Sequence, residues 1–515
     1  MQLKTLLAQV KPLQVNGPVD REIAAVAYDS RRVKKDGLFV ALPGEHTDGG
    51  AFVEQAISQG AVAVVGGQAA GQNSRATMVA VANPRAALAD IAAAWFQHPA
   101  NHLKMTGVTG TNGKTTVTFL LKHILEKSTM RCGLLGTVRY EIGQRHLPAT
   151  RTTPESLDVQ DLLFQIRSAG CNAAVMEVSS HALAQERVRG VEFDVAVFTN
   201  LTQDHLDYHK TMEAYFEAKS LLFTGLAAQL KKKGKAIVNI DDSYGARLLE
   251  KIPKELEGAP PAAPESRQRK NAGLQQTEVL TYGMGVRADF RASAMNIDYS
   301  GTSYQLDARG KSYFVRLPLI GRFNVYNSLA AIAAASALGV EVRAAVQALA
   351  TAPHVPGRLE AVPVKRQFRV FVDYAHTDDA LLNVIKTLRE LSPNRLIVVF
   401  GCGGNRDRAK RPLMGAVADR HADYSIITSD NPRKEEPLAI IDEIKAGFSG
   451  KNFEVKIDRR DAIFQAITLA QPRDIILIAG KGHETYQEFS DHTVPFDDVD
   501  TAMQAVAANP VAMQE

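Results

Sequence analysis

A glycine-rich turn that carries a lysine and a threonine is the part of this sequence best suited to chemistry. It reads TGTNGKTT at residues 109–116 and follows a short apolar run, residues 105–108, that can end a strand. Strand, glycine-rich turn and helix together bind phosphate, because free backbone N–H groups and the positive end of the helix then face the anion. The helix is predicted from apolar residues at helical spacing, namely Val117, Leu120, Leu121, Ile124 and Leu125.

The residue types of this turn suit a nucleoside triphosphate. Gly110 and Gly113 let the backbone direct its N–H groups toward an anion. Lys114 can reach the terminal phosphates, and the hydroxyl of Thr115 can ligate Mg²⁺. The strict pattern G-x-x-x-x-G-K-[ST] is not met, because its first glycine falls on Val108. The alternative is a purely structural turn, and the amphipathic helix that follows favours phosphate binding.

Two polar side chains follow predicted strands further along the chain. The apolar run at residues 173–176 ends on Glu177, and the run at residues 194–200 leads into a polar segment that contains His205. Ligands of open α/β sheets gather beyond the carboxyl ends of the strands, so both side chains are expected near the phosphate turn. The alternatives are a solvated acid at a strand end for Glu177 and a capping histidine for His205.

The bulk properties describe an ordinary globular protein without a polyanionic partner. A chain of 515 residues is too long for one core, and at roughly 150 residues per domain it predicts three domains. Apolar residues make up 45% and charged residues 23%, which is typical of soluble proteins. The net charge of +4, from 60 basic and 56 acidic residues, does not indicate nucleic acid. The basic cluster at residues 231–235 is expected to be a solvated helix end.

Cysteine usage and hydropathy indicate a cytoplasmic protein. Cys132, Cys171 and Cys402 lie far apart and show no metal-type spacing, which fits a reducing compartment. The first residues contain no apolar core of signal-peptide length. No run of about 20 apolar residues occurs either, so membrane insertion is not expected.

The order of predicted elements indicates an α/β fold in three domains. Residues 1–100 are expected to form a small α/β domain, with a boundary at the His98-Pro99 break after an alanine-rich helix. Residues 101–350 alternate strands and helices, which predicts a central domain like a P-loop ATPase with a mostly parallel sheet. The polar stretch at residues 254–277 is expected to be a flexible insertion.

Residues 351–515 are expected to form a Rossmann-like domain with a binding site. Four apolar runs each lead into a charged or glycine-rich loop, and the loops are expected at one edge of a parallel sheet. The fingerprint G-x-G-x-x-G with a downstream acid is lacking, so a dinucleotide is not expected. Four such loops with arginines and acids favour a site over four unrelated turns.

Nine short motifs are spread along the chain. They are TGTNGKTT, MEVSSHAL, TNLTQDHLDYH, GRFNVYN, HVPGRLE, VDYAHT, GCGGNRDRAKRP, DNPR and AGKGHE. From about Tyr28 onward the sequence resembles the Mur ligase family, ATP-dependent amide-forming ligases of peptidoglycan synthesis. It is most similar to members that extend UDP-N-acetylmuramoyl-L-alanyl-D-glutamate, and DNPR matches the version that adds meso-2,6-diaminopimelate rather than L-lysine.

The resemblance implies two chemical steps. The γ-carboxylate of the bound D-glutamate attacks the γ-phosphate of ATP, and an amine of diaminopimelate then attacks the acyl phosphate. It also implies two Mg²⁺ ions, a carboxylated Lys219 that serves as an oxygen ligand, and a monomer. An ordinary surface lysine is the alternative for Lys219. The implied catalytic residues are Lys114, Glu177, His205 and Lys219, and the implied metal ligands are Thr115, Glu177, His205 and Lys219.

The resemblance also implies binding residues for each small molecule. For ATP they are Gly110, Thr111, Asn112, Gly113, Lys114, Thr115, Thr116, Asn324, Asn327, Arg358 and Asp373. For the nucleotide-linked substrate they are Tyr28, Ser30, Glu45, His46, Thr47, Arg151, Thr152, Thr153, Ser179, Gln185 and Arg187. For diaminopimelate they are Arg406, Asp430, Asn431, Pro432, Arg433, Gly480 and Glu484.

The sequence departs from the family pattern at two positions and is compatible with more than one function. Arg151 stands where relatives carry Asn, and Asp378 stands where Pro is usual, so the local loop shapes are in question. A folyl- or polyglutamate ligase shares the central domain and chemistry but does not explain the N-terminal domain or DNPR. The L-lysine-adding Mur ligase, a P-loop ATPase that drives motion or assembly, and a nucleotide-binding module without turnover are also compatible with the phosphate turn.

Overall fold

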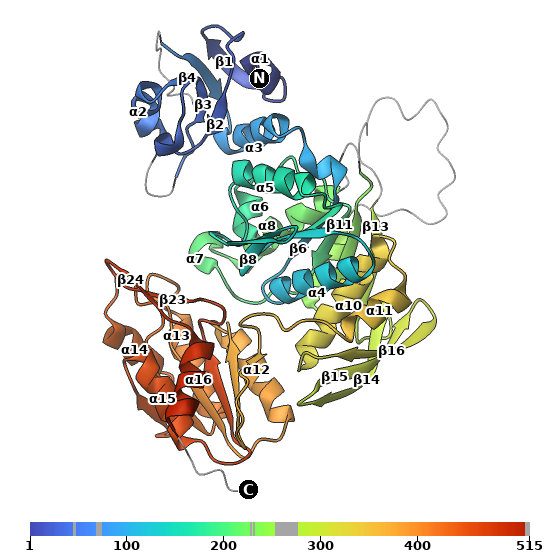
Figure 1. Ribbon diagram of the computed structural model, residues 1–515, viewed down its shortest axis with the longest axis vertical. Coiled ribbons are helices and arrows are strands. Elements are labelled where there is room, and N and C mark those ends of the chain that lie inside the picture. The colour runs from blue at the N-terminus through green and yellow to red at the C-terminus, as the bar shows by residue number, and fades with distance from the viewer. Residues whose placement is uncertain (45–47, 68–74, 227–228, 230–231, 253–276, 510–515) are drawn as a thin grey trace.

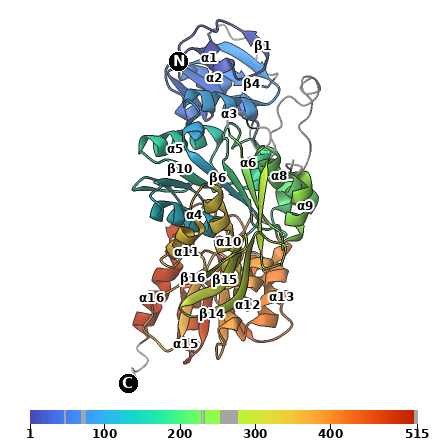
Figure 2. The ribbon, with the colours of Figure 1, turned by 90° about the vertical axis from the view of Figure 1, so that its right-hand side faces the viewer.

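A computed structural model describes residues 1–44, 48–67, 75–226, 229, 232–252 and 277–509. The predicted site residues Glu45, His46 and Thr47 lie outside these ranges, and so does the predicted insertion except for Thr277. The α/β fold is confirmed: three large sheets follow one another along the long axis of the molecule, from the N-terminal to the C-terminal part of the chain, and the described residues add a small two-stranded sheet in the C-terminal part (Figures 1 and 2). Each sheet falls within one of the three predicted domains, whose boundaries stay predictions.

The N-terminal sheet has five strands in the order β1-β5-β4-β3-β2, and only the β1–β5 pair is antiparallel. Its core combines apolar residues of the inner strands with α1 and α3. A 3-10 turn, Gly49–Phe52, leads directly into the short helix α2. The elements are α1 (Leu3–Leu7), β1 (Pro12–Asn16), β2 (Ala25–Ala27), β3 (Gly37–Val40), α2 (Val53–Ser58), β4 (Ala61–Gly66), β5 (Thr77–Val81) and α3 (Pro84–Trp95).

The central sheet has eleven strands in the order β16-β15-β14-β13-β12-β11-β6-β10-β7-β8-β9. The strands from β14 to β7 pair in parallel, whereas β15, β16, β8 and β9 add antiparallel hairpins at the two edges. The strands are β6 (Lys104–Thr109), β7 (Cys132–Leu135), β8 (Arg139–Ile142), β9 (Arg145–Pro148), β10 (Ala173–Glu177), β11 (Val195–Phe198), β12 (Lys235–Asn239), β13 (Glu278–Gly283), β14 (Phe290–Asp298), β15 (Gly301–Ala308) and β16 (Lys311–Leu317).

Helices cover both faces of the central sheet. The buried apolar stripe of α4 packs beside the alanine-rich α10, because small alanine side chains let two helices approach closely. Residues of the other face form a second core with α5 and α8. The helices are α4 (Lys114–Lys127), α5 (Ser156–Ser168), α6 (Ser180–Ala184), α7 (Leu206–His209), α8 (Met212–Thr224), α9 (Ser243–Lys251), α10 (Arg322–Ala337) and α11 (Val342–Leu349).

The C-terminal sheet has six strands in the order β17-β18-β22-β19-β20-β21, parallel except for the β17–β18 pair. Its apolar strands are buried on both faces, as a parallel sheet between helices requires. The elements are β17 (Glu360–Ala361), β18 (Arg369–Asp373), α12 (Asp378–Glu390), β19 (Leu396–Phe400), α13 (Lys410–His421), β20 (Tyr424–Ile427), α14 (Pro437–Lys445), β21 (Phe453–Val455), α15 (Arg459–Leu469), β22 (Ile475–Ala479), β23 (Tyr486–Glu488), β24 (Thr493–Pro495) and α16 (Asp498–Ala508).

The topology brings the chemically important strand ends to one edge. β6 lies between β10 and β11 and is parallel to both, so the phosphate turn after β6 and Glu177 at the end of β10 share that edge. β11 ends at the same edge, and the polar segment that begins there contains His205. The expected position of both side chains beyond the carboxyl ends of the strands is therefore met.

The basic cluster at residues 231–235 differs from its prediction as a solvated helix end. Lys232 is only 11% exposed, and its ammonium group contacts the Asp194 carboxylate at 2.7 Å. The same ammonium donates hydrogen bonds to two backbone carbonyls, of Ala100 and Leu103. Lys235 begins β12. The prediction failed because three adjacent lysines look solvated in sequence, while a long lysine stem can bury itself and reach a distant partner.

Within the described ranges, no helix is long and apolar enough to cross a membrane. All three cysteines are free thiols and buried.

Candidate functional site

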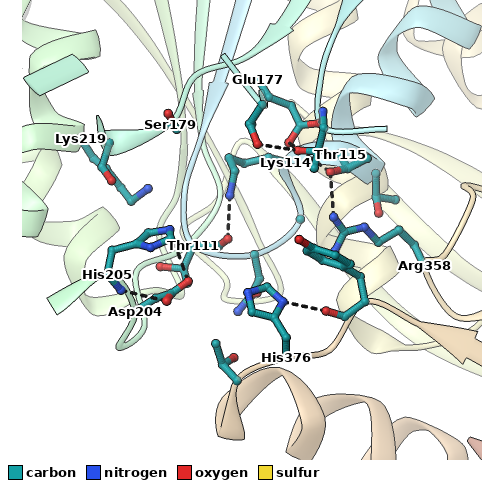
Figure 3. Close-up of a pocket in the computed structure, with 18 residues that line it drawn as sticks. Thr111, Lys114, Thr115, Glu177, Ser179, Asp204, His205, Lys219, Arg358 and His376 are labelled. Atoms are coloured by element: carbon teal, nitrogen blue, oxygen red, sulfur yellow. Dashed lines mark hydrogen bonds and ion pairs between the residues drawn. The ribbon is translucent and has the colours of Figure 1, made fainter. Parts of the chain in front are cut away.

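The phosphate turn forms one wall of a cavity of about 160 Å³, which we call the phosphate cavity (Figure 3). Both central and C-terminal residues line it. Among the predicted site residues, the structure brings together here Thr111, Asn112, Gly113, Lys114, Thr115, Thr116, Thr152, Glu177, Ser179, His205, Lys219 and Arg358.

The turn itself has the backbone shape that glycine permits. Gly110 has φ +149° and Gly113 has φ +86°. A Cβ on Gly110 would lie 1.8 Å from Oγ1 of Thr199, and a Cβ on Gly113 would lie 2.4 Å from Oδ1 of Asn327. A larger residue at either position would therefore clash as well as strain the backbone. Lys114 follows immediately and begins α4, so it stands at the positive end of that helix.

The Lys114 ammonium folds back over the turn. Its Nζ donates hydrogen bonds to the carbonyls of Gly110 at 3.0 Å and Thr111 at 2.8 Å. Burial lowers the pKa of Lys114, and the nearby Glu177 carboxylate opposes that shift. In the described contacts, no carboxylate bonds this ammonium group, which lies inside the cavity. Its positive charge is therefore available to an anionic partner such as a phosphate.

Glu177 is fully buried and held by three donors. Thr137 donates from its backbone N–H at 2.8 Å and from its hydroxyl at 3.0 Å. The hydroxyl of Thr115 donates at 3.1 Å. This hydroxyl also accepts a hydrogen bond of 3.2 Å from Nη2 of Arg358, which comes from the C-terminal part of the chain (Figure 3). A threonine hydroxyl beside a carboxylate offers oxygen ligands of the kind that Mg²⁺ binds.

Lys219 is the second buried ammonium of the cavity, which removes the alternative of a surface lysine. Its side chain is 2% exposed. Nζ donates to the Gly110 carbonyl at 2.8 Å and lies 4.6 Å from the centroid of the Tyr215 ring. Burial, and secondarily the positive charge of Lys114, hold the pKa of Lys219 well below its ordinary value. A lowered pKa is what addition of CO₂ to an amine requires, because only the neutral amine reacts.

His205 stands at the edge of the cavity in a left-handed conformation, with φ 55°, and is the N-cap residue of α7. Its ring makes no capping hydrogen bond to the helix. His205 therefore occupies the N-cap position with its backbone, while its ring does not act as a cap. Nε2 lies 3.5 Å from the Asp204 carboxylate. Burial lowers the pKa of His205 to about 4, so the ring is neutral near pH 7 and a nitrogen lone pair is available to a metal.

Acidic and histidine side chains alone do not build a metal site here. In the described part of the chain, no three His, Cys, Asp or Glu side chains form a group that could hold an ion. A magnesium ion would therefore need the Thr115 hydroxyl beside Glu177, and a second ion would need an oxygen from a modified Lys219 beside His205. The residues present fit the first ion directly and the second only after carboxylation of Lys219.

Several residues of the phosphate cavity were not predicted from the sequence. Thr137, Asp204, Tyr374, His376 and Thr377 line it. Asp204 belongs to the motif TNLTQDHLDYH, and Tyr374, His376 and Thr377 belong to VDYAHT. These two motifs could therefore have identified the four residues as members of the site. Thr137 lies outside every motif. Its role comes from the hairpin between β7 and β8, which places its donors against Glu177.

A larger cavity of about 750 Å³ opens between the central and C-terminal parts, and we call it the large cavity. Three C-terminal loops form one side: residues 401–408, 430–433 and 480–484. We call these the C-terminal loops. The predicted site residues that line the large cavity are Arg151, Thr152, Thr153, Ser179, Arg187, His205, Arg406, Asp430, Asn431, Arg433, Gly480 and Glu484.

The C-terminal loops hold one another through direct hydrogen bonds. Arg433 donates from Nε to Glu488 at 2.8 Å and from Nη1 to the Gly404 carbonyl at 2.9 Å. Asn431 donates from Nδ2 to Glu484 at 2.8 Å. Arg433 has φ 52°, a left-handed conformation that is uncommon outside glycine and often marks a functional site. Pro432 precedes it and is buried, and it does not line the large cavity.

Three arginines beside the large cavity form a cluster around one carboxylate. Glu155 lies 3.1 Å from Arg187, 3.3 Å from Arg151 and 3.4 Å from Arg85. Thr153 donates its hydroxyl hydrogen bond to the Glu177 carbonyl at 2.8 Å and so ties this cluster to β10. Three cations around one acid leave a net positive charge beside the large cavity. Gln185 does not line the large cavity; its side chain hydrogen-bonds to Arg187 and Tyr208.

The remaining predicted residues are not all in contact with these cavities. Asn324 and Arg358 line a separate pocket of about 180 Å³, while Asn327 packs against the phosphate turn. Asp373 is buried behind the cavity, accepts hydrogen bonds from the N–H groups of Leu359 and Ala375, and has its pKa raised by burial to about 6. Tyr28 bonds Asp158 of the central part at 2.5 Å and lines a pocket of about 520 Å³, while Ser30 bonds Gln55.

The fold and the site define an α/β protein of three parts with a phosphate-binding turn, and comparison with known proteins shows its family. Residues 22–96 match the family described as Mur ligase family, catalytic domain. Residues 108–258 and 262–335 match the Mur ligase middle domain, and residues 357–482 match the Mur ligase, glutamate ligase domain. The chain therefore belongs to the Mur ligase family.

Individual relatives cover nearly the whole chain. A UDP-N-acetylmuramoyl-L-alanyl-D-glutamate–2,6-diaminopimelate ligase of Caldanaerobacter subterraneus subsp. tengcongensis is 43% identical over 98% of this chain and 99% of its own. An enzyme of the same name from Geobacter sulfurreducens is 42% identical over 98% of both chains. A solved structure of a ligase with this name is 33% identical, with a TM-score of 0.67 and 99% of both chains covered.

A folylpolyglutamate synthase of Mycobacterium tuberculosis, solved with ADP and AMPPCP, is similar in fold alone. It is 19% identical, with a TM-score of 0.61 over 76% of this chain and 91% of its own.

Proposed function

We propose that this protein is the Mur ligase that joins meso-2,6-diaminopimelate to UDP-N-acetylmuramoyl-L-alanyl-D-glutamate at the expense of ATP. The observation that carries the proposal is that the phosphate cavity and the large cavity share part of their walls. Residues of both are Thr137, Thr152, Ser179, Asp204, His205, Tyr374 and His376. An acyl phosphate formed beside Lys114 is then within reach of an amine held by the C-terminal loops.

The choice of amine rests on the C-terminal loops and on the relatives. Diaminopimelate carries a second amino-acid head, a carboxylate beside an ammonium, which L-lysine lacks. The large cavity is lined by two arginines for the carboxylate, Arg406 and Arg433, and by Asp430 and Glu484 for the ammonium. Full-length relatives that are more than 40% identical bear the name of the diaminopimelate-adding ligase.

The first step transfers a phosphoryl group. A γ-carboxylate oxygen of the D-glutamate bonds to the γ-phosphorus of ATP, the bond to the bridging oxygen breaks, and ADP leaves. Phosphoryl transfer depends mainly on positioning and on neutralising charge. Lys114 supplies positive charge, backbone N–H groups of the turn cradle the phosphates, and Arg358 approaches from the C-terminal part.

The second step forms the amide. The neutral amine of diaminopimelate attacks the acyl carbon, the tetrahedral intermediate expels inorganic phosphate, and the amine loses its proton. Magnesium bound by Thr115 and Glu177, with a second ion beside His205 and a carboxylated Lys219, would stabilise the phosphate charge in both steps. Asn324 and the pocket beside Arg358 are proposed to receive the adenosine part of ATP.

The nucleotide end of the substrate is proposed to bind the pocket beside Tyr28, with the arginine cluster around Glu155 near its acidic peptide. We also propose that the protein acts as a monomer in the cytoplasm. Three free, buried thiols are compatible with a reducing compartment.

One assay tests the proposal against the competing functions. Phosphate release is measured with ATP, Mg²⁺ and each pair of acceptor and amine, and the products are weighed by mass spectrometry. We expect release only with the UDP-linked dipeptide and meso-diaminopimelate, together with a product that contains both. Product from a folate acceptor with glutamate would identify a folylpolyglutamate-type ligase, and turnover without an amide product would identify an ATPase.

A further inference from the structure

Lys481 is fully buried in the last of the C-terminal loops and does not reach the large cavity. Its side chain is 0% exposed, whereas its neighbours Gly480, His483 and Glu484 line the cavity. Gly480 and Gly482 have φ values of +116° and +54°, and this tight turn directs Lys481 inward. A buried cation needs partners, so what its ammonium contacts determines its role.

The ammonium of Lys481 joins two residues that do line the cavity. Nζ donates to Oδ1 of Asn431 at 3.0 Å and to Oε2 of Glu484 at 3.1 Å. It also lies 5.5 Å from the centroid of the Tyr486 ring. One buried charge therefore fixes a neutral amide and an acid that belong to different loops.

These contacts force the orientation of the Asn431 amide. The Lys481 ammonium and the backbone N–H of Glu488, at 2.9 Å, are both donors, so the amide atom that faces them must be the oxygen. The NH₂ group then faces the Glu484 carboxylate, at 2.8 Å. One N–H of Asn431 bonds Glu484, and the other has no partner among the described residues and is available to an acceptor in the cavity.

The same contacts give the two oxygens of the Glu484 carboxylate different roles. Oε2 accepts from both Asn431 and Lys481, while Oε1 has no donor among the described residues and can accept from an ammonium in the cavity. We infer that Lys481 is a positioning residue for the amine substrate. It fixes Asn431 as a donor toward a carboxylate and Glu484 as an acceptor toward an ammonium, and thereby sets the orientation in which a zwitterionic amino-acid head can bind.

This inference rests on the proposed function, since it concerns the amine site of that ligase. The test compares steady-state constants of the unmodified protein, Lys481→Met and Lys481→Gln, using whichever amine the unmodified protein consumes. Consumption of another amine would contradict the proposed substrate without deciding the role of Lys481. Lys434→Met is the matched control, because Lys434 is exposed, adjoins Arg433 and, within the described part of the chain, forms its hydrogen bond through the backbone N–H.

We expect both Lys481 variants to raise KM for the amine by roughly tenfold or more, with kcat changed by less than about threefold. KM for ATP and for the acceptor is expected to stay unchanged. The ratio of kcat/KM between meso-diaminopimelate and L-lysine is expected to fall, because the Glu488 N–H alone then holds the Asn431 oxygen and the Glu484 carboxylate has lost its cationic partner.

Two outcomes would overturn the inference. The first is an unchanged KM and an unchanged ratio in a variant that still binds ATP. The second is a loss of ATP binding together with amine binding in both variants, which would show that Lys481 only maintains the fold.

Discussion

Two buried ammonium groups share one carbonyl oxygen in the phosphate site. Nζ of Lys114 and Nζ of Lys219 donate to the Gly110 carbonyl at 3.0 and 2.8 Å. Two cations at such a point repel each other, and carboxylation of Lys219 would remove one positive charge and add a negative one. The geometry therefore gives Lys219 a physical reason to be modified that its sequence context alone did not.

We predict that Lys219 carries a carboxyl group in the active protein. Depleting the buffer of CO₂ should reduce ligation, and bicarbonate should restore it, because the lowered pKa of Lys219 leaves a reactive neutral amine. Carbon-13 NMR after labelling with ¹³C-bicarbonate should show one carbamate signal that is lost in Lys219→Ala and retained in Lys210→Ala, an exposed lysine nearby. Full activity without such a signal would contradict the modification.

Lys114→Ala should leave a folded protein that ligates on the order of a hundredfold more slowly or worse. The loss is expected because a positioned charge that stabilises transferring phosphate is worth several kcal/mol in the transition state. Initial rates, with circular dichroism as the check on folding, measure this effect. Lys127→Ala is the control, because Lys127 is exposed at the far end of the same helix. Near-normal rates in a folded Lys114→Ala protein would remove this lysine from the chemistry.

Sequence was most informative about site residues that lie in one contiguous stretch. The phosphate turn is expected to bind phosphate through its own backbone, so its local sequence is enough to predict its geometry. Lys114 and Thr115 indeed line the phosphate cavity. Thr137 could not be found in this way, because its contact with Glu177 depends on the pairing of distant strands. The hydrogen bond from Arg358 to Thr115 likewise spans two parts of the chain.

At the scale of elements, α6 and α7 bring three histidine rings together. The ring centroids of His181 and His205 lie 4.9 Å apart, and those of His181 and His209 lie 5.4 Å apart. His209 is buried and its Nε2 lies 2.9 Å from the hydroxyl of Ser180. Burial lowers the pKa of each of the three rings to about 4.

These histidines should make the protein less stable in mild acid. Each pKa is lowered from 6.5 to about 4 in the folded state, so the unfolded chain binds protons that the folded one does not. The free energy of unfolding should fall as pH decreases from about 6.5 to about 4. Urea midpoints at about pH 7.5 and about pH 4.5 should differ less for His209→Gln than for the unmodified protein. An equal difference would show that His209 does not contribute.

The strands and helices of the sheets were predictable, and their departures have local causes. Apolar runs with clear ends became β6, β10 and β11, because burial on both faces leaves little choice of residue. The hairpin strands at the edges of the central sheet carry mixed patterns and were not predicted. The left-handed backbone at His205 was not predicted either, since its residue type does not require it.

At the scale of the whole molecule, the site exists only because the central and C-terminal parts meet. Nδ2 of Asn112, in the phosphate turn, donates to the Asp379 carboxylate of α12 at 3.2 Å. Asp379 adjoins Asp378, the position where the sequence departs from the family pattern, and α12 begins there as a regular helix capped by Thr377. Asp378 therefore occupies the first turn of a regular helix.

Arg433→Ala should raise KM for meso-diaminopimelate by roughly tenfold or more while leaving KM for ATP and for the UDP-linked dipeptide nearly unchanged. The reason is that Arg433 lines the large cavity with the C-terminal loops and not the phosphate cavity. Steady-state kinetics with each substrate varied in turn measure the effect. Arg420→Ala is the matched control, an exposed arginine at the end of α13. A rise in KM for ATP instead would place Arg433 at the nucleotide.

The most direct measurement is a competition between two amines. The unmodified protein is given ATP, Mg²⁺, the UDP-linked dipeptide and equal concentrations of meso-diaminopimelate and L-lysine, and the products are quantified by mass spectrometry. We expect the diaminopimelate product to exceed the lysine product by a factor of roughly 10³, because L-lysine leaves the charged groups of the C-terminal loops without partners. Equal amounts of the two products, or an excess of the lysine product, would contradict the proposed specificity.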